Sequence, residues 1–425
     1  MIKFYRIITS LLYPFFILLI ILRKFLNKED RLRYKEKIFS SKFNVLKKKN
    51  IPLIWFHAAS IGEFKSILPI IENLISGVKS FEFLVTTTTL TSANLAKEEL
   101  KKFNNVQHRF LPIDIKFLMQ NFMNMWKPSA IFLVDSEIWP NLIMTAKEKK
   151  IPIMLLNARI TSKSFKRWNL ISKHAKSIFE SFHFSLTSNQ ETKKFLQKLN
   201  GKNIFYTGNI KLASKIYLNK NLNKDYLIKN KFWFAASSHD GEEIFFLKTH
   251  QKLKKKFEKI TTIIAPRHIS RVQSIKKLCD RFNFKSQILN KNEYILEDNE
   301  IIIINSFGEL ASYFECAKSV FIGKSLLKRL ERVGGQNPVD AAKLGCKIYH
   351  GPFVYNFEEI YSILEKNKIS NKIETVDELA ESLFIDLEQT KKNTQRFSDK
   401  MDNLGKKTLT DTMSYINNFL LNEIK

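Results

Sequence analysis

The sequence predicts an α/β protein built from two doubly wound domains with parallel sheets. Short apolar or β-branched runs alternate with amphipathic helical stretches along most of the 425 residues. The runs are nearly continuous in apolar residues, as in strands buried on both faces. The alternation restarts near residue 230, after a stretch at 211–231 rich in Lys, Asn and Leu. Alternating strands and helices favour doubly wound sheets, and the chain is long enough for two of them.

The apolar runs place five strands in each half of the chain. In the first half we expect strands at 53–56, 81–86, 130–134, 153–156 and 184–186. In the second half we expect them at 232–235, 261–264, 301–304, 320–322 and 347–349. We therefore divide the chain into an anchor and basic segment at 1–40, a first Rossmann-like domain at 41–212 and a second at 213–405. An amphipathic helix at 406–425 must dock on one of them, and the sequence leaves its place open.

The N-terminus has the composition of a membrane anchor. Residues 7–22 carry no charge, and basic residues flank them on both sides. As a helix this stretch covers about 24 Å, less than the roughly 30 Å of a hydrocarbon core, so it either just spans the bilayer or enters one leaflet. Pro14 permits a kink, and no small-residue cleavage site follows, which argues against a signal peptide. The basic run at 28–49 suits the cytoplasmic leaflet, whose acidic lipids attract it.

The charge balance favours anionic partners. The chain has 70 Lys and Arg against 41 Asp and Glu, a formal net charge of +29. Nucleic acid, acidic lipid headgroups and phosphorylated or carboxylated substrates all fit that charge. The three cysteines and eight histidines show no metal-ligand spacing, so neither a metal site nor a cofactor is indicated, and sparse cysteines argue against a disulfide framework.

Glu63 is the strongest catalytic candidate in the first half. It lies in the run HAASIGE at 57–63, directly after a predicted strand and at the start of a predicted helix. Corners of this kind face the ligand crevice of α/β proteins, where a carboxylate serves as a general base toward a hydroxyl. The alternative is that Glu63 only complements the helix dipole, and position alone does not separate the two roles.

Two further candidates come from other strand ends of the first half. Glu137, in the segment DSEIWPN at 135–141, offers a second carboxylate near the same rim. Its alternative is a solvated acid beside a core aromatic, Trp139. Lys211, in TGNIK at 207–211, lies at the domain junction.

The second half carries candidate anion contacts. The run GGQNPVDAA at 334–342 places Asn337 as an N-cap, Pro338 at the first helical position and Asp340 in a capping box. The glycines leave room for close approach of another molecule, and such a helix start suits a phosphate; the alternative is an ordinary loop end. Arg267 follows another strand and could clamp a phosphate or carboxylate, or be an ordinary surface arginine.

Taken together, these segments resemble one family, the 3-deoxy-D-manno-octulosonic acid (Kdo) transferases of lipopolysaccharide synthesis. The matching stretches occur in the family's order over nearly the whole chain: HAASIGE, TTTTLTS, DSEIWPN, NARIT, TGNIK, APRH, SFGEL and GGQNPVDAA. Each stretch alone is unspecific, whereas the ordered set is specific. The chain departs from the family pattern at Asp340, where Glu is usual, at Lys324, where Gly is usual, and in a longer segment at 327–333.

The resemblance implies a GT-B fold with an N-terminal acceptor domain and a C-terminal donor domain. It implies transfer of Kdo from CMP-Kdo to lipid IVA, a lipid A precursor, with release of CMP by a metal-independent inverting displacement. Glu63 then matches the general base, while Glu137 and Lys211 match residues that stabilise the transition state. The matching donor-binding positions are Pro266, Arg267, Phe307, Gly308, Glu309, Gly334, Gly335, Gln336, Asn337 and Asp340.

The implied location is the inner membrane, with the anchor among its lipids and the catalytic domains on the cytoplasmic face. Two other functions stay open at this point. One is a membrane-associated GT-B transferase that uses a UDP-sugar. The other is a membrane-tethered nucleic-acid binder explained by the positive charge, although the chain lacks interleaved aromatic RNA motifs and any helix-turn-helix pattern, so we expect no nucleic-acid partner.

Overall fold

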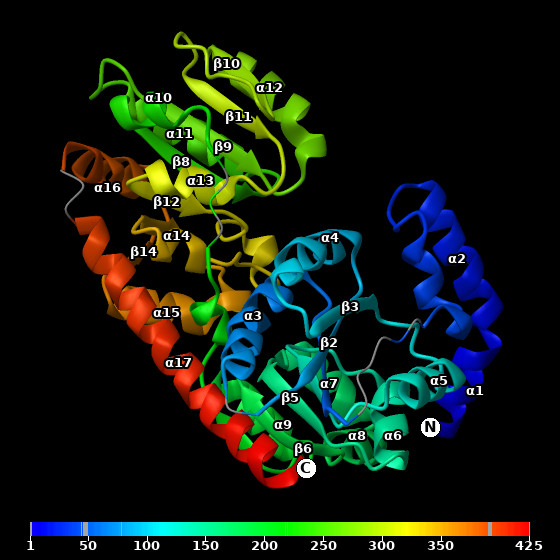
Figure 1. Ribbon diagram of the computed structural model, residues 1–425. Coiled ribbons are helices and arrows are strands. Elements are labelled where there is room, and N and C mark those ends of the chain that lie inside the picture. Colours follow the sequence, from blue (N-terminus) through cyan, green and yellow to red (C-terminus); the bar gives the residue numbers. More distant parts are fainter. Residues whose placement is uncertain are drawn as a thin grey trace. The chain divides into compact units, whose positions relative to one another are not determined.

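The structure is a computed structural model that describes residues 2–43, 45, 50–77, 79–216, 218, 220–389 and 393–424, without the side chains of 393–395. The chain divides into two compact units (Figure 1). Unit 1 comprises Met1–Lys215 and Gly405–Lys425, and unit 2 comprises Ile216–Leu404. The division therefore falls three residues after the expected boundary at 212.

Unit 1 is built on a seven-stranded parallel sheet. Its strand order is β3 (Val106–Phe110), β2 (Glu82–Thr87), β1 (Leu53–His57), β4 (Ala130–Val134), β5 (Ile153–Ala158), β6 (Phe182–Thr187) and β7 (Ile204–Tyr206). The chain moves outward from β1 in one direction and then restarts at β4 in the other. The gap between β1 and β4 is therefore the topological switch point, where open α/β sheets bind their ligands.

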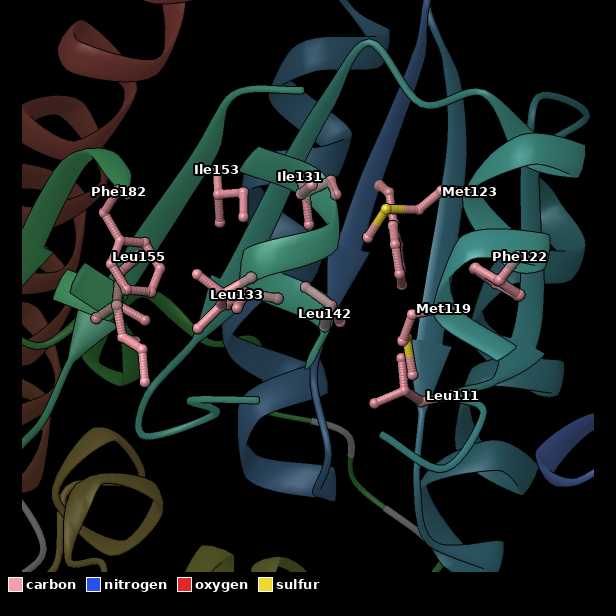
Figure 2. Close-up of a cluster of buried hydrophobic side chains, with 14 of the residues drawn as sticks. Leu111, Met119, Phe122, Met123, Ile131, Leu133, Leu142, Ile153, Leu155 and Phe182 are labelled. Atoms are coloured by element: carbon pink, nitrogen blue, oxygen red, sulfur yellow. The ribbon is translucent and has the colours of Figure 1, made fainter. Parts of the chain in front are cut away.

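The helices of unit 1 cover the sheet and bury its apolar side chains. They are α3 (Ile61–Ile75), α4 (Leu90–Glu99), α5 (Lys116–Trp126), α6 (Pro140–Glu148), α7 (Ser162–Leu170), α8 (Ser172–Phe179) and α9 (Gln190–Lys198). Figure 2 shows side chains of α5 and α6 facing those of β4 and β5 in one cluster, which includes Met119, Phe122, Leu133, Leu142 and Leu155. Burial of each of these side chains contributes about 1.5–3 kcal/mol to stability. This packing holds the ends of the strands in place.

Unit 2 repeats the design with a second seven-stranded parallel sheet. Its strand order is β10 (Ser286–Asn290), β11 (Ile301–Asn305), β9 (Thr261–Pro266), β8 (Phe232–Ser238), β12 (Ser319–Ile322), β13 (Lys347–His350) and β14 (Ser370–Lys372). Its helices are α10 (Lys224–Lys229), α11 (Glu242–Leu253), α12 (Val272–Arg281), α13 (Leu310–Cys316), α14 (Val339–Lys343), α15 (Glu358–Lys366) and α16 (Val376–Glu388). Here the switch point lies between β8 and β12.

The long C-terminal helix α17 (Asn393–Glu423) belongs to both units, because the division falls within it. Its last turns pack on unit 1. The Phe419 ring lies 5.8 Å from that of Phe184 on β6, and the Tyr415 ring stacks at 4.4 Å on Phe205 of β7. The docking place that the sequence left open is thus the β6–β7 side of unit 1.

The N-terminal stretch forms two helices, α1 (Ile2–Leu11) and α2 (Tyr13–Phe25), bent by 55° at the break between them. In the described part of the chain, a membrane-spanning length and apolarity is reached only by this bent pair taken together. One side of the pair packs on the rest of unit 1, where the Tyr13 ring lies 5.0 Å from that of Phe117 on α5. Its other side exposes large apolar side chains: Phe4, Ile7, Leu11, Phe15, Leu18, Leu22 and Phe25.

The expected α/β class with two Rossmann-like units is confirmed. All ten expected strands are present, and several extend by one to three residues beyond the expected ends. The structure adds four strands that the sequence did not indicate, β3, β7, β10 and β14, and each lies at an edge of its sheet.

Candidate active site

Glu63 is held at the corner between β1 and α3. Ser60 is the N-cap of α3, and the Glu63 carboxylate accepts hydrogen bonds from the Ala59 N–H at 2.7 Å and from the Ser60 hydroxyl at 2.8 Å. Glu63 also lies in the first turn of α3, where its charge complements the helix dipole, so the local role that the sequence left open is present as well. These two contacts also fix the carboxylate at the carboxyl end of β1, beside the switch point.

The surroundings of Glu63 favour its protonated form. Burial raises the pKa of the Glu63 carboxyl above its ordinary value, and the negative charges of Asp135 and Glu137 raise it further. The two hydrogen bonds from Ser60 and Ala59 act in the opposite direction without cancelling the effect. A carboxylate with a raised pKa is a stronger base than a solvated one, which suits proton abstraction from a hydroxyl.

Glu137 lies on the other side of the switch point, after β4, and is held rather than solvated. Its Oε2 accepts a hydrogen bond from the Trp139 indole N–H at 2.8 Å and lies 3.3 Å from Nε2 of His57. His57 is fully buried, and its Nδ1 lies 3.0 Å from the Thr86 hydroxyl. Trp139 also packs partly against the core, so it combines the two roles considered for it. Glu137 and Glu63 are thus drawn to one rim.

Lys211 reaches the same rim through an ion pair. It lies in the short 3-10 helix η4 (Ile210–Ala213), and its Nζ lies 2.5 Å from Oδ2 of Asp135. The other carboxylate oxygen, Oδ1, accepts a hydrogen bond from Asn157 Nδ2 at 2.6 Å. Asn157 in turn accepts from the Ile210 N–H at 3.0 Å. Asp135 and Asn157 therefore fix both the charge and the backbone of the Lys211 segment.

Asp135 and Asn157 occupy strained backbone positions at the ends of β4 and β5. Their φ angles are 58° and 51°, in the left-handed region that non-glycine residues adopt infrequently. Asp and Asn tolerate this region better than other side chains, and strain of this kind clusters at functional sites. In this conformation Asp135 pairs with Lys211, and Asn157 binds Asp135 and the Ile210 N–H.

The threonine-rich segment after β2 fixes the loop that carries Glu63. The Thr88 hydroxyl and the Ser92 hydroxyl each donate to the Ala59 carbonyl at 3.1 Å, and the Ala58 N–H donates to the Thr86 carbonyl at 3.0 Å. The segment TTTTLTS thus acts on the site through the backbone at 58–59.

A group of basic side chains gathers at the switch point of unit 2. Arg267 follows β9 with its side chain exposed, and its backbone N–H donates to the Ser238 carbonyl at the end of β8. The ring of His239 lies 6.2 Å from that of His268. Burial lowers the pKa of His239, and the charges of Lys324, His268 and Arg267 lower it further. We call Arg267, His239, His268 and Lys324 the cation cluster.

A buried carboxylate organises the loop behind the cation cluster. Glu242, the first residue of α11, accepts hydrogen bonds from the backbone N–H groups of His239 at 2.9 Å, Lys324 at 2.7 Å, Ser325 at 2.8 Å and Leu326 at 3.1 Å. Burial raises the pKa of Glu242 although these four bonds oppose the shift. Glu242 therefore ties the end of β8 to the loop that follows β12.

The glycine pair at 334–335 has a different neighbour from the one expected. A Cβ on Gly334 would lie 2.1 Å from the Phe353 carbonyl oxygen, and one on Gly335, at φ +88°, would lie 3.0 Å from the Val354 carbonyl oxygen. In the structure the protein's own backbone makes the close approach. The glycines thus permit the packing of the loop that carries Gln336, whose carbonyl accepts from the Tyr361 hydroxyl at 3.1 Å.

The helix after the glycines also starts differently. α14 begins at Val339 rather than at Pro338, and Pro338 takes the N-cap position without a side-chain cap. The Asn337 side chain still caps this segment as expected, because it accepts a hydrogen bond from the Val339 N–H at 3.1 Å. The capping box through Asp340 stays a prediction. With only five residues, α14 is too short to act as an anion site by its dipole alone.

The remaining donor candidates lie at the end of β9 and after β11. Pro266 is the buried last residue of β9. Glu309 precedes α13 and accepts a hydrogen bond from the Ser306 hydroxyl. Phe307 is 64% exposed, and a Cβ on Gly308 would meet no atom within 4 Å, so this turn is open to solvent.

The site therefore falls into two clusters, one at the switch point of each sheet. Glu63, Glu137 and Lys211 belong to the first, and Arg267 belongs to the second. Sequence reasoning missed the supporting roles of His57, Asp135 and Asn157. An Asp or Asn directly after an apolar strand, where a left-handed residue often ends the strand, was the available signal.

Comparison with known proteins finds relatives that match most of the chain. Residues 31–214 match the family model described as 3-deoxy-D-manno-octulosonic-acid transferase (kdotransferase). The 3-deoxy-D-manno-octulosonic acid transferase of Rickettsia bellii is 29% identical over 99% of this chain and 100% of its own length. That of Rickettsia typhi is 31% identical over 78% of this chain and 71% of its own length. A probable mitochondrial enzyme of the same name from Arabidopsis thaliana is 30% identical over 76% of this chain and 75% of its own length.

Solved structures share the fold at low sequence identity. A UDP-N-acetylglucosamine 2-epimerase matches with a TM-score of 0.60 and 12% identity over 88% of this chain and 97% of its own. A glycosyltransferase from Rickettsia africae matches with a TM-score of 0.56 and 10% identity over 88% of this chain and 100% of its own. These likenesses concern the fold alone, and they confirm the GT-B class.

Proposed function

The chain belongs to the 3-deoxy-D-manno-octulosonic acid transferase family and is a glycosyltransferase, and from this premise we propose that it transfers Kdo from CMP-Kdo to lipid IVA with release of CMP. The observation that carries the proposal is the carboxylate of Glu63. It is fixed by two hydrogen bonds at the switch point of unit 1, next to two further acidic side chains.

The proposed first event is proton abstraction from a hydroxyl of the acceptor. Glu63 takes the proton while the hydroxyl oxygen forms a bond to C2 of Kdo. The bond between C2 and the phosphate oxygen breaks, and CMP leaves with the electron pair. The raised pKa of Glu63 supports this role, because the base must accept a proton during the displacement.

Glu137 and Lys211 are proposed to stabilise charge in this step. Positive charge develops on the sugar as the leaving group departs, and the negative charge of Glu137 offsets it. Lys211 forms an ion pair with Asp135 and offers a cation to the anionic donor. The Trp139 and Asn157 contacts support these roles, because they hold the charges in place before substrate arrives.

The donor is proposed to bind unit 2 at the cation cluster. CMP-Kdo carries a phosphate and a carboxylate, and the leaving group is a phosphate ester that needs charge stabilisation more than a proton. Arg267 is exposed beside the switch point of the second sheet and suits bidentate contact with such a group. Glu309, Gln336 and Asn337 are half-buried or exposed, and at the donor-binding positions of the family pattern they supply hydrogen-bonding groups for the nucleotide.

We also propose that α1 and α2 associate with the inner membrane by entering its cytoplasmic leaflet, with both units on the cytoplasmic side. The exposed apolar side of the bent pair supports this, as does the basic segment that follows it. Flotation with vesicles containing acidic lipid tests it. Leu11→Glu combined with Leu18→Glu should abolish co-flotation, and Ile385→Glu, at a side chain of α16 in unit 2 that is 55% exposed, should leave it unchanged. Equal flotation of all three proteins would contradict this location.

The transfer itself is tested by incubating the protein with CMP-Kdo and lipid IVA and weighing the lipid by mass spectrometry. The expected product has gained one or more Kdo units. Titration with CMP and with UDP in parallel separates the donor classes, and binding of CMP alone is expected. An unmodified lipid together with preferential UDP binding would replace the proposal by a UDP-sugar transferase.

A further inference from the structure

Lys324 occupies the switch point of unit 2 in an unusual backbone conformation. It follows β12 and Gly323, next to the end of β8, where the strand order reverses. Its φ angle is +62°, in the left-handed region that disfavours a lysine relative to a glycine. A non-glycine residue kept in such a conformation at a ligand crevice points to a use for its side chain.

The surrounding loop determines this conformation from both sides. The Lys324 N–H donates to the Glu242 carboxylate at 2.7 Å, and its carbonyl accepts from the Gly335 N–H at 2.7 Å. Gly323 before it has no room for a side chain, since a Cβ there would lie 2.7 Å from the Ser237 carbonyl oxygen. The backbone of Lys324 is therefore fixed whatever its side chain does.

The side chain itself is a half-buried cation without a counter-ion. Within the described residues, no carboxylate forms an ion pair with Lys324 or with Arg267. The titratable groups that influence one another here are the members of the cation cluster, and the two that carry a positive charge at neutral pH are Arg267 and Lys324. Uncompensated positive charge that is partly removed from water favours an anion as its partner.

We propose that Lys324 binds an anionic oxygen group of the nucleotide-sugar donor, and that Glu242 positions it by holding the backbone at 324–326. The inference rests on the proposed function, which supplies a donor with a phosphate and a sugar carboxylate. Lys324 contacts one of these two groups. It thereby sets donor affinity in this chain beyond the contacts assigned to Arg267 and the 334–337 loop.

Lys324→Gly tests the inference, because glycine relieves the backbone conformation while it removes the ammonium group. Lys324→Asn removes the charge and retains a side chain that tolerates positive φ. Lys368→Gly is the matched control, because it also replaces a lysine at positive φ, 58°. Lys368 is exposed and precedes the edge strand β14, so it lies away from the switch point. Melting temperatures of the three variants verify that each is folded.

Calorimetric titration with CMP and the KM for CMP-Kdo give the readout. Loss of one charge-assisted hydrogen bond should weaken binding about tenfold or more in both Lys324 variants and leave the control unchanged. Weaker binding of both CMP and CMP-Kdo assigns the contact to the phosphate, and a raised KM for CMP-Kdo with unchanged CMP affinity assigns it to the sugar carboxylate. Wild-type affinity for both in the folded variants would overturn the inference alone. Wild-type protein that binds no CMP would overturn the proposed function as well.

Discussion

The ion pair of Asp135 and Lys211 offers a quantitative test of how the site is assembled. The two side chains are 12% and 16% exposed, and the atoms lie 2.5 Å apart. At an effective dielectric constant of about 20, the gross attraction is on the order of 6 kcal/mol, and desolvation offsets much of it. Removal of one partner leaves an uncompensated charge, which for buried pairs costs about 3–5 kcal/mol.

The perturbation is a double-mutant cycle of Asp135→Asn and Lys211→Met. Asparagine tolerates the positive φ at this position, so Asp135→Asn isolates the loss of charge. We expect Asp135→Asn to destabilise unit 1 by about 3 kcal/mol. The loss of stability in the double variant should be about 2 kcal/mol smaller than the sum of the losses in the two single variants. The control is Glu72→Gln, which breaks exposed pairs and should cost less than about 1 kcal/mol.

The assay is urea unfolding followed by tryptophan fluorescence. Four of the five tryptophans lie in unit 1, so the signal reports mainly on the unit that carries the pair. A cycle that is additive within about 0.5 kcal/mol would refute the reasoning, because it would mean that the two charges do not depend on each other. Asp135→Asn should also shift the acidic limb of kcat/KM to lower pH, since the Asp135 charge helps to raise the pKa of Glu63.

Two further predictions concern stability. Gly334→Ala should cost several kcal/mol of stability or prevent folding of unit 2, because its Cβ would lie 2.1 Å from the Phe353 carbonyl oxygen. Gly62→Ala is the control and should be neutral, because an added Cβ there meets no atom within 4 Å. Equal melting temperatures of the two variants would contradict the packing. Burial and the charge of Arg33 lower the pKa of His108 to about 3, so the unfolded chain takes up a proton between about pH 6.5 and 3 that the folded chain resists. The free energy of unfolding should therefore fall as pH falls through this window. Urea unfolding at about pH 7 and pH 4 should show a loss that is smaller by up to about 3 kcal/mol in His108→Gln than in the wild type. The same loss in both proteins would contradict this role of His108.

The strands that sequence patterns predicted and those that they missed differ in one physical respect. β1, β4, β8 and β12 are buried on both faces and read as continuous apolar runs. β3, β7, β10 and β14 lie at sheet edges, and their side chains are partly exposed. An edge strand needs few apolar residues, so its local sequence resembles that of a loop. Its existence follows from the neighbouring strand with which it pairs.

The site shows a similar limit. The placement of Glu63 and Glu137 beside the switch point could be predicted, because each follows an apolar strand and a turn. The contact of Asp135 with Lys211 joins residues that are 76 positions apart, and it depends on the order β1–β4–β5 in the sheet. The glycines at 334–335 were singled out for the approach of another molecule, which stays a prediction, and only the folded loop shows how closely the Phe353 carbonyl packs on Gly334.

The central claim is that the Glu63 carboxylate removes the acceptor proton, and single-turnover transfer by Glu63→Gln tests it most directly. Glutamine retains an oxygen that accepts the Ala59 N–H bond, so the corner between β1 and α3 should keep its shape. We predict that the rate of Kdo transfer falls by about 10²–10⁴-fold while CMP affinity and melting temperature stay at wild-type values. Transfer at the wild-type rate by the folded variant would contradict the account.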